Sequence, residues 1–394
     1  MTKERCYDLV LVGATGFTGR LTAKYLAAHA PPRLRWALSG RDQSKLAAIA
    51  ATLAREWPDQ SEPDIMVTDA GDEIALRAVA ETSRVVVTTI GPYVSRGEPL
   101  VAACIAGGAD YLDITGETEF VDRIWLDHHA EAERKGVRLV HCCGFIAIAE
   151  DLGAYFTVQH LPQDAPLKVN GHVRFRLRFS GGSYRSLIQS FARSRQRQVV
   201  ARSRQAVEAE PSARKVYALP GKVRRNSYLG GWVTPDSSIS AITVRRTAAV
   251  LPSYGPEFGY GHHLVFRRFS ALSGFFLTAT AAGVFLRLVP VRKLLLKMKK
   301  AGVGPDQTER DRSWFELIFI GEGAGRTVIT KVTGGDPGYD ETAKMLAESA
   351  LCIAFDDLPR RSGQLTPALA MGDALMRRLR TAGISFQIVK TSTI

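Results

Sequence analysis

The sequence has few cysteines, and none of them are arranged for a metal site or a disulfide framework. Its 394 residues include five cysteines, and no two of them form a Cys-x-x-Cys pair. It also lacks a His-Glu-x-x-His motif, and its two pairs of adjacent histidines cannot place two ligands on one helix face. No metal is therefore expected, and a reducing cytoplasm is the expected compartment.

A long hydrophobic run near the N-terminus is also lacking. The first apolar stretch, residues 9–12, is too short for a secretory signal peptide. With 45% hydrophobic and 23% charged residues, a chain of this length can bury two cores. Two domains are therefore expected.

The most informative feature present is an apolar strand that leads into closely spaced glycines. Residues 9–12 precede Gly13, Gly16 and Gly19, and a helix is expected over residues 20–30. In this pattern the glycines permit a tight turn, backbone approach to a pyrophosphate, and close packing of helix on strand. Such glycines can form an ordinary turn, but a second strand at 34–38 favours a dinucleotide site.

The end of the second strand indicates which nucleotide binds. NAD sites usually carry an acidic residue there, whereas NADP sites carry a nearby arginine. Ser39 stands where the acid is expected, and Arg41 follows Gly40 and can form a charge-assisted fork on a 2′-phosphate. NADP(H) is the expected cofactor, while Asp42 leaves NAD open.

Strand-like and Ala-rich helical segments alternate over the first 150 residues. Further strands are expected at 64–68, 84–90, 111–114 and 137–142. This alternation is typical of an α/β protein with a Rossmann-type, doubly wound parallel sheet. Because ligands bind at the carboxyl ends of such strands, the expected cofactor site also includes Asp69, Thr88, Thr89, Gly91, Pro92 and Tyr93.

After about residue 150 the pattern changes to longer strands of alternating polarity. Strands are expected at 173–179, 239–245, 314–321 and 326–332, with a Gly-rich turn joining the last two. Residues 1–150 are thus expected to form the nucleotide-binding domain, and residues 151–338 an inserted α+β domain for substrate or partner. The last part, 339–394, is expected to pack back on the first domain through helices at 341–355 and 367–379 and a strand at 385–389.

The positive charge is concentrated in one segment. Residues 174–225 contain 14 Lys or Arg and two acids, a balance of +12 against +13 for the whole chain. This favours an anionic partner such as a phosphopantetheine carrier, a coenzyme A ester or an acidic lipid surface, although a solvated helix face is an equal alternative. Nucleic acid is not expected, because no recognition motif accompanies the charge.

A second unusual segment spans residues 269–300. Its first 18 residues, 269–286, are uncharged, and six Lys or Arg residues follow between 287 and 300. Peripheral attachment to an anionic membrane is favoured, because serines, threonines and glycines dilute the apolar run. A buried helix lining an apolar pocket and a membrane span remain alternatives.

Several motifs together resemble a known family. They are GATGFTGRLTAKYL at 13–26, ALSGRD at 37–42, VVVTTIGPYVSRGEPLVAACIAGGADYLDITGE at 85–117, CCGFIAIAEDLG at 142–153, GYDETAKMLAESAL at 338–351 and LTPALAMGDAL at 365–375. The chain resembles the saccharopine dehydrogenase-like oxidoreductases, in the branch that contains trans-acting enoyl reductases. This resemblance implies NADP(H)-dependent reduction of an enoyl double bond in a lipid-like or polyketide substrate, and possible carrier attachment of that substrate. It also implies the cofactor residues named above, together with four more in the first loop: Ala14, Thr15, Phe17 and Thr18.

One motif departs from the family pattern. After Cys-Gly-Phe the branch usually has Asp-Ser-Ile-Pro, whereas this chain has Ile146, Ala147, Ile148 and Ala149. The acid lost at Ile146 would follow a strand end, where substrate and nicotinamide meet. Either the substrate is more apolar here or the chemistry has weakened.

Enoyl reduction needs a group that stabilises and protonates the enolate. Tyr93 is the first candidate for this catalytic role and Glu117 the second, because both follow strand ends at the cofactor edge. A rival hypothesis is a membrane- or lipid-associated nucleotide-binding protein with little turnover. A cytoplasmic protein at the inner face of the membrane, with a homodimer as one option, fits both hypotheses.

Overall fold

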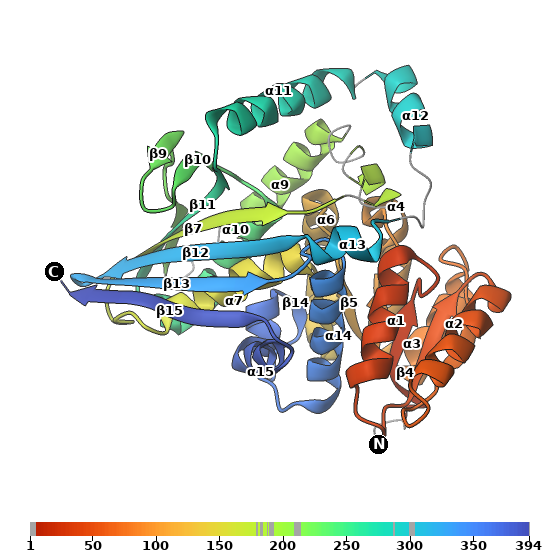
Figure 1. Cartoon of the computed structure of the whole chain (residues 1–394). Coiled ribbons are helices and arrows are strands. Elements are labelled where there is room, and N and C mark those ends of the chain that lie inside the picture. The colour runs from red at the N-terminus through yellow and green to blue at the C-terminus, as the bar shows by residue number, and fades with distance from the viewer. Residues whose placement is uncertain are drawn as a thin grey trace.

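The computed structural model describes residues 5–178, 180–181, 184–186, 188, 193–208, 214–286, 288–298 and 304–393. Two β-sheets lie next to each other, and helices cover their faces (Figure 1). The first sheet lies toward the N-terminus, and the long strands of the second extend away from it. No helix in the described ranges is both long and apolar enough to cross a membrane.

The first sheet consists of seven parallel strands in the order β14-β6-β5-β4-β1-β2-β3. Strand β1 lies inside this sheet, and Leu9, Val10 and Leu11 in it are fully buried. The strand order reverses between β1 and β4, which is where ligands bind in such sheets. The predicted doubly wound α/β sheet is confirmed. Its strands are β1 (Tyr7–Val12), β2 (Trp36–Gly40), β3 (Asp64–Val67), β4 (Ser83–Thr88), β5 (Asp110–Asp113), β6 (Arg138–Val140) and β14 (Gly363–Leu365).

Helices cover both faces of this sheet. On one face α14 packs against α1 and against strands β4 and β5. Helices α3 and α5 pack against each other in a separate layer. Helix α14 packs on the first sheet, as expected for the helix at 341–355, and strand β14, which was not expected, adds an edge strand to the same sheet. The helices are α1 (Phe17–His29), α2 (Gln43–Glu56), α3 (Glu73–Thr82), α4 (Tyr93–Arg96), α5 (Glu98–Gly107), α6 (Thr118–Lys135), α7 (Phe145–Val158), α14 (Asp340–Phe355) and α15 (Pro367–Thr381).

The second sheet is mixed, with the order β15-β13-β12-β7-β11-β10-β9 and with β8 paired to β11. Helix α7 packs under β7, β12 and β13, and the contact is close: a Cβ at Gly153 would lie 2.3 Å from the ring of Phe319. The predicted hairpin is present, since β12 and β13 pair up to a turn at Ala324 and Gly325, both with positive φ. The strands are β7 (Leu167–Arg176), β8 (Lys215–Ala218), β9 (Arg224–Asn226), β10 (Gly231–Pro235), β11 (Glu257–Phe266), β12 (Trp314–Gly323), β13 (Arg326–Gly334) and β15 (Ser385–Thr393).

Two expectations about the second half of the chain are wrong. The segment expected as a strand at 239–245 is helix α10 (Ile239–Val250), whose buried side chains include Ala241, Val244 and Ala248 at helical spacing. The β-branched residues of this segment suggested a strand. In the structure the segment is helical, and the helix packs on α7. The last strand, β15, does not return to the first sheet: it pairs with β13 at the edge of the second.

The basic segment is partly neutralised inside the protein. Helix α9 (Ser194–Glu208) packs along α6, where Arg204 is buried between Asp122 and Glu208 and stacks on Trp125. Arg193 forms a fork on Glu119 with a 2.9 Å bond from Nε. The other three arginines between residues 193 and 204 are exposed, as expected for a solvated helix face: Arg195, Arg197 and Arg202.

The apolar-basic segment forms α11 (Phe269–Phe285) and α12 (Val289–Met298), an arm above the strands of the second sheet (Figure 1). The alternative that this segment lines an internal pocket is wrong, because Leu272 is the one buried residue of α11. Arg287, Lys299 and Lys300 lie outside the described residues. The remaining elements are η1 (Pro252–Tyr254) and α13 (Gln307–Asp311).

Candidate active site

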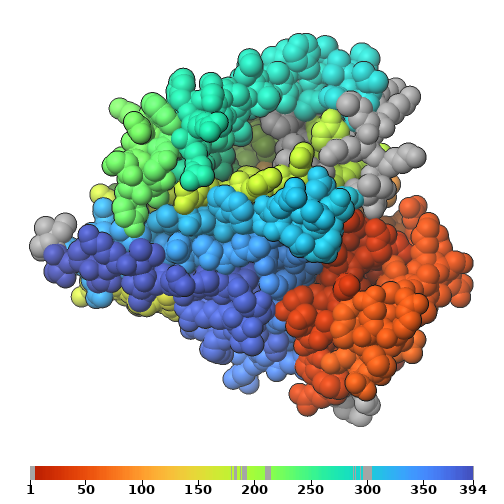
Figure 2. Space-filling view, in the orientation of Figure 1, coloured from red at the N-terminus to blue at the C-terminus, as the bar shows by residue number. Residues whose placement is uncertain are grey.

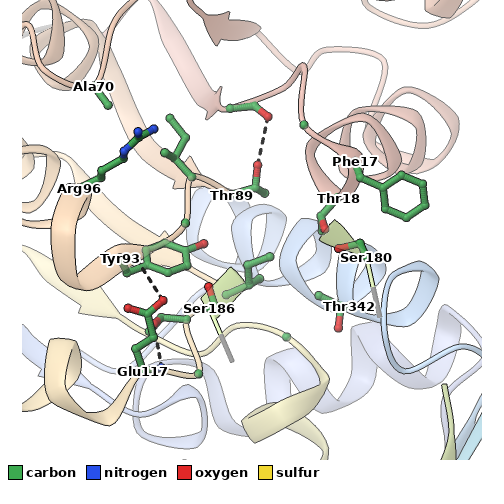
Figure 3. A pocket seen from close by; sticks show the side chains of 18 of the residues that line it. Phe17, Thr18, Ala70, Thr89, Tyr93, Arg96, Glu117, Ser180, Ser186 and Thr342 are labelled. Atoms are coloured by element: carbon green, nitrogen blue, oxygen red, sulfur yellow. Dashed lines mark hydrogen bonds between the residues drawn. The ribbon is translucent and has the colours of Figure 1, made fainter. Parts of the chain in front are cut away.

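An open cleft of about 820 Å³ lies at the carboxyl ends of β1, β2, β4 and β5, where the strand order reverses (Figure 3). One part of its wall follows β1 and β2, and another follows β4 and β5. A third part comes from the start of α7, from the end of β7 and from the residues before α14. Both halves of the molecule therefore contribute to one site.

The turn after β1 has the shape of a pyrophosphate cradle. Gly13 adopts a φ of +87°, and its N–H donates to the carbonyl of Ser39 at 2.8 Å. A Cβ at Gly19 would lie 2.2 Å from the carbonyl oxygen of Gly13. Helix α1 begins after Gly16, which has no side chain to cap the first amides of the helix. These amides are therefore available to an anion, so the residues present fit a dinucleotide.

The end of β2 carries the residues expected to select the nucleotide. Gly40 and Arg41 line the cleft, and Arg41 is exposed. Asp42, which left NAD open, instead caps α2: its carboxylate accepts from the Lys45 N–H at 3.0 Å and pairs with the Lys45 ammonium at 2.8 Å. Ser39 is fully buried and supports the glycine loop through its carbonyl. The arrangement favours a 2′-phosphate at Arg41.

Most of the residues predicted for the site lie together around the cleft. Those that line it are Gly13, Thr15, Gly16, Phe17, Thr18, Gly40, Arg41, Asp69, Thr89, Gly91, Tyr93 and Glu117. The predicted residues that do not line it are Ala14, Gly19, Ser39, Thr88 and Pro92. Gly19 lies in the first turn of α1, Ser39 and Thr88 lie at the ends of β2 and β4, and Ala14 and Pro92 lie in the turns. Gly19 and Ser39 act by shaping the loop.

Several residues that line the cleft come from distant segments and were not predicted from the sequence. Ser180 and Ser186 enter from the second domain, and Tyr339 and Thr342 enter from the start of α14. Arg96, at the end of α4, also lines the cleft (Figure 3). The GYDE motif at 338–341 was a usable signal for the α14 contribution, but nothing in the sequence pattern placed Ser180 or Ser186 at this site.

The two candidate catalytic residues lie side by side. The Glu117 carboxylate accepts from the backbone N–H of Tyr93 at 3.2 Å and of Val94 at 2.8 Å. The Ser186 side chain lies near this carboxylate at the cleft and lowers the pKa of Glu117 (Figure 3). Burial raises the pKa of Glu117, and these hydrogen bonds oppose the rise. The Tyr93 hydroxyl donates to the Thr88 carbonyl at 3.1 Å, and burial raises its pKa well above the usual range. A direct role for either residue stays a prediction.

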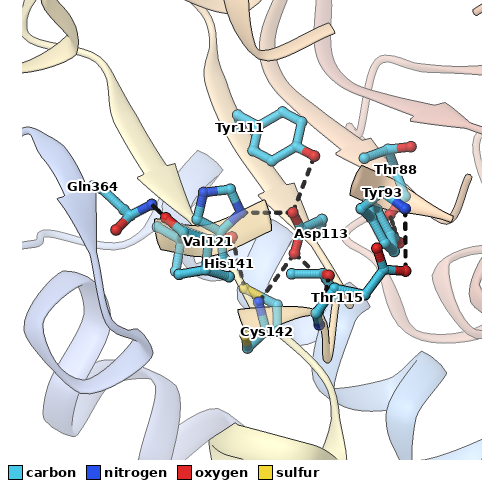
Figure 4. Close-up of polar contacts among 12 residues, drawn as sticks. Thr88, Tyr93, Tyr111, Asp113, Thr115, Val121, His141, Cys142 and Gln364 are labelled. Atoms are coloured by element: carbon cyan, nitrogen blue, oxygen red, sulfur yellow. Dashed lines mark hydrogen bonds and ion pairs between the residues drawn. The ribbon is translucent and has the colours of Figure 1, made fainter. Parts of the chain in front are cut away.

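A buried carboxylate holds two of the cleft loops in place (Figure 4). One oxygen of Asp113, at the end of β5, accepts from the backbone N–H of Thr115 and of Cys142, each at 3.0 Å. The other oxygen accepts from the Tyr111 hydroxyl at 3.0 Å and bonds the His141 ring nitrogen Nδ1 at 2.6 Å. Asp113 thus ties the turn after β5 to the turn after β6, and Cys142 takes a φ of +63° there.

Part of the cleft wall is apolar. Ile114, Phe145, Ile146 and Leu177 line it, and Ile146 is 48% exposed. The carbonyl of Ile146 accepts from the Ser240 hydroxyl of α10, which fixes the start of α7. In the part of the chain that the structure describes, no group of three or more His, Cys, Asp or Glu residues is placed to hold a metal ion.

Comparison with known proteins gives concordant results. Residues 9–140 match the saccharopine dehydrogenase NADP-binding domain. A trans-acting enoyl reductase of Mycobacterium tuberculosis H37Rv is 31% identical over 416 residues, with 97% of each chain covered. A trans-acting enoyl reductase of Mycobacterium ulcerans is 30% identical, with 97% of each chain covered.

A solved structure gives the same fold. Apo saccharopine dehydrogenase (L-Glu forming) from Saccharomyces cerevisiae aligns with 98% of this chain and 100% of its own at a TM-score of 0.56, with 14% identity. At that identity the likeness concerns the fold alone. The full-length match to the enoyl reductases, the NADP-binding domain and the cleft agree, and the chain belongs to the saccharopine dehydrogenase-like family of NADP(H)-dependent oxidoreductases, in the branch of the trans-acting enoyl reductases.

Proposed function

We propose that the protein reduces the carbon–carbon double bond of an α,β-unsaturated acyl thioester, with NADPH as the hydride source. The observation that carries this proposal is the apolar wall of the cleft. Ile146 projects into the position where the family usually has an acid, and Phe145 and Leu177 flank it. An acyl chain gains free energy by covering such side chains, whereas the charged groups of an amino-acid substrate would lose hydration there.

The form in which the substrate arrives is suggested by a small neighbouring cavity of about 100 Å³. Leu177 lines both this cavity and the main cleft, and Arg176, Arg178 and Arg312 line the cavity alone. Arg178 pairs with Glu309 at 3.6 Å, while Arg176 and Arg312 make no ion pair within the described ranges. Two cations beside the apolar wall suit the phosphates of a coenzyme A or phosphopantetheine arm.

NADPH, held at the glycine turn after β1 and at Arg41, would supply the hydride for the β-carbon of the substrate. A proton must then reach the α-carbon. Because the Tyr93 hydroxyl is buried and donates to a backbone carbonyl, we assign this step to the Ser186 hydroxyl, which is partly exposed and lines the cleft. Its O–H bond breaks as the C–H bond forms, and the serine oxygen then takes a proton from solvent that reaches the open cleft. Glu117 lies beside Ser186 and acts as a positioning residue.

The test compares two thioesters that share one unsaturated acyl chain. One is the coenzyme A ester and the other is the N-acetylcysteamine ester, which lacks phosphate. NADPH consumption is followed for each. Replacing Arg176 and Arg312 together by Ala should raise KM for the coenzyme A ester about tenfold, the effect of losing one to two charge-assisted hydrogen bonds. KM for the short ester should not change.

The matched control is Arg195→Ala, which removes an exposed cation of α9 far along the chain from this cavity. An equal rise in KM for both esters would contradict the phosphate assignment. If wild-type protein bound NADPH but consumed none with saturating enoyl thioesters of several chain lengths, the non-catalytic hypothesis would replace the proposed reaction.

A further inference from the structure

Helix α11 exposes more apolar surface than a helix at a protein surface ordinarily does. The exposed fractions are 58% for Phe269, 72% for Leu277, 58% for Val284 and 54% for Phe285. Figure 2 shows the helix as a ridge along the upper edge of the molecule, separated by a hollow from the strands of the second sheet. A contiguous apolar surface of this kind indicates a site that something else covers.

The ridge is nevertheless anchored to the body. The ring of Phe269 packs on Trp232 of β10 with centroids 5.0 Å apart, and Phe275 packs on Phe266 of β11 at 5.3 Å. Leu272 is buried at the same end of the helix. The first turns of α11 are therefore held against the second sheet, and the remaining turns carry their apolar side chains away from it.

The charge around α11 indicates what covers it. No acidic residue occurs between Glu257 and Asp306, whereas eight Lys or Arg residues do. Arg267 and Arg268 are exposed at the start of the helix, where cations interact unfavourably with the helix dipole, so they do not serve helix stability. The neighbouring strand β9 adds exposed Arg224 and Arg225.

We propose that α11 docks on an anionic membrane surface, with its phenylalanine and leucine side chains in the headgroup region and the flanking arginines on lipid phosphates. A 17-residue helix is about 25 Å long, and it would lie in the plane of the membrane. A second copy of this chain is disfavoured as the partner, because a twofold interface would place the same cationic surface against itself. The proposal is independent of the reaction in the cleft.

The test is sedimentation of the whole protein with vesicles of phosphatidylcholine alone or mixed with phosphatidylglycerol. Wild-type protein should bind the mixed vesicles at least tenfold more tightly, and binding should weaken as salt is raised. Replacing Leu277 and Phe285 by Ser should weaken binding tenfold or more. The matched control is Ile74→Ser on α3, which removes an 85% exposed apolar side chain of the first domain.

Retained NADPH affinity in each variant shows that the protein is folded. Absence of wild-type binding to the mixed vesicles, equal binding to both vesicle types, or equal binding by the α11 and Ile74 variants would each overturn the proposal. Loss of a wild-type dimer in the α11 variant, measured by light scattering and without vesicle binding, would assign the ridge to a second copy instead.

Discussion

Backbone shapes the glycine turn on the nucleotide side of the cleft, whereas side chains form the apolar wall that we propose for the substrate. The turn after β1 owes its shape to Gly13, Gly16 and Gly19. A side chain at Gly19 would collide with the backbone of this turn. The proposed substrate wall depends on Ile146 and Leu177, from α7 and the end of β7, and on Ser186 of the second domain. A backbone cradle accepts one chemical group, while a side-chain wall can change its substrate by substitution.

The first prediction tests the nucleotide side and has the largest expected effect. Gly19→Ala places a methyl group where the Gly13 carbonyl oxygen lies only 2.2 Å away, so the turn must move. NADPH affinity, measured by fluorescence titration, should fall about 100-fold, in line with overpacking costs near 3 kcal/mol. The control is Gly274→Ala in α11, where a Cβ meets no atom within 4 Å. Equal affinity in the two variants would show that loop shape does not determine binding.

The second prediction tests the substrate side by deleting one hydroxyl at a time. Ser186→Ala should lower kcat about 100-fold, as expected for loss of a proton donor, and leave NADPH affinity unchanged. Tyr93→Phe should lower kcat less than tenfold, because its hydroxyl donates to the Thr88 carbonyl. The reverse order of the two effects would return the donor role to Tyr93.

The same contrast explains what the sequence could predict. The glycine turn, the strand ends after β1, β2 and β4, and the choice of NADP depend on residues close together in the chain, and most of them line the cleft. The spacing of apolar residues that indicates a strand or a helix is also a local signal. Most of the first sheet and the β12–β13 hairpin were therefore predictable. Glu117 was found because it follows a strand end.

What could not be predicted depends on contacts between distant segments. Ser186 reaches Glu117 from 69 positions away only because the second domain folds over the cleft. The segment at 239–245 is rich in β-branched residues and suggested a strand, but packing against α7 makes it a helix. Strand β15 joins the second sheet by pairing with β13. No local sequence pattern indicates this pairing.

The third prediction tests the selectivity of the nucleotide side. Arg41→Ala should reduce the preference for NADPH over NADH about tenfold, since a charge-assisted hydrogen bond to the 2′-phosphate is lost. NADH affinity should stay the same. Arg55→Ala, which removes an exposed cation of α2, is the control. An unchanged preference in Arg41→Ala would place the 2′-phosphate elsewhere, and the cleft-lining Arg96 would be tested next.

The last prediction concerns the support beneath the substrate wall and has the smallest expected effect. Asp151 of α7 is fully buried and accepts from the Thr247 hydroxyl at 2.6 Å and the Ala368 N–H at 2.8 Å. Burial raises its pKa to about 7. At pH values between the pKa of this carboxyl in the unfolded chain and its pKa in the folded protein, the folded protein keeps a proton that the unfolded chain has lost. The free energy of unfolding therefore falls as pH rises through this range.

Asp151→Asn removes this titration and keeps the shape of the side chain. The free energy of unfolding of the variant, relative to wild type, should therefore rise between pH 5 and pH 7, by on the order of 1 kcal/mol. Urea titrations at several pH values measure the difference, and Asp59→Asn supplies an exposed carboxylate as control. A difference independent of pH would mean that Asp151 is ionised in the folded protein throughout this range. Its hydrogen bonds from Thr247 and Ala368 would then outweigh burial, and α7 would be held by a charged group rather than a neutral one.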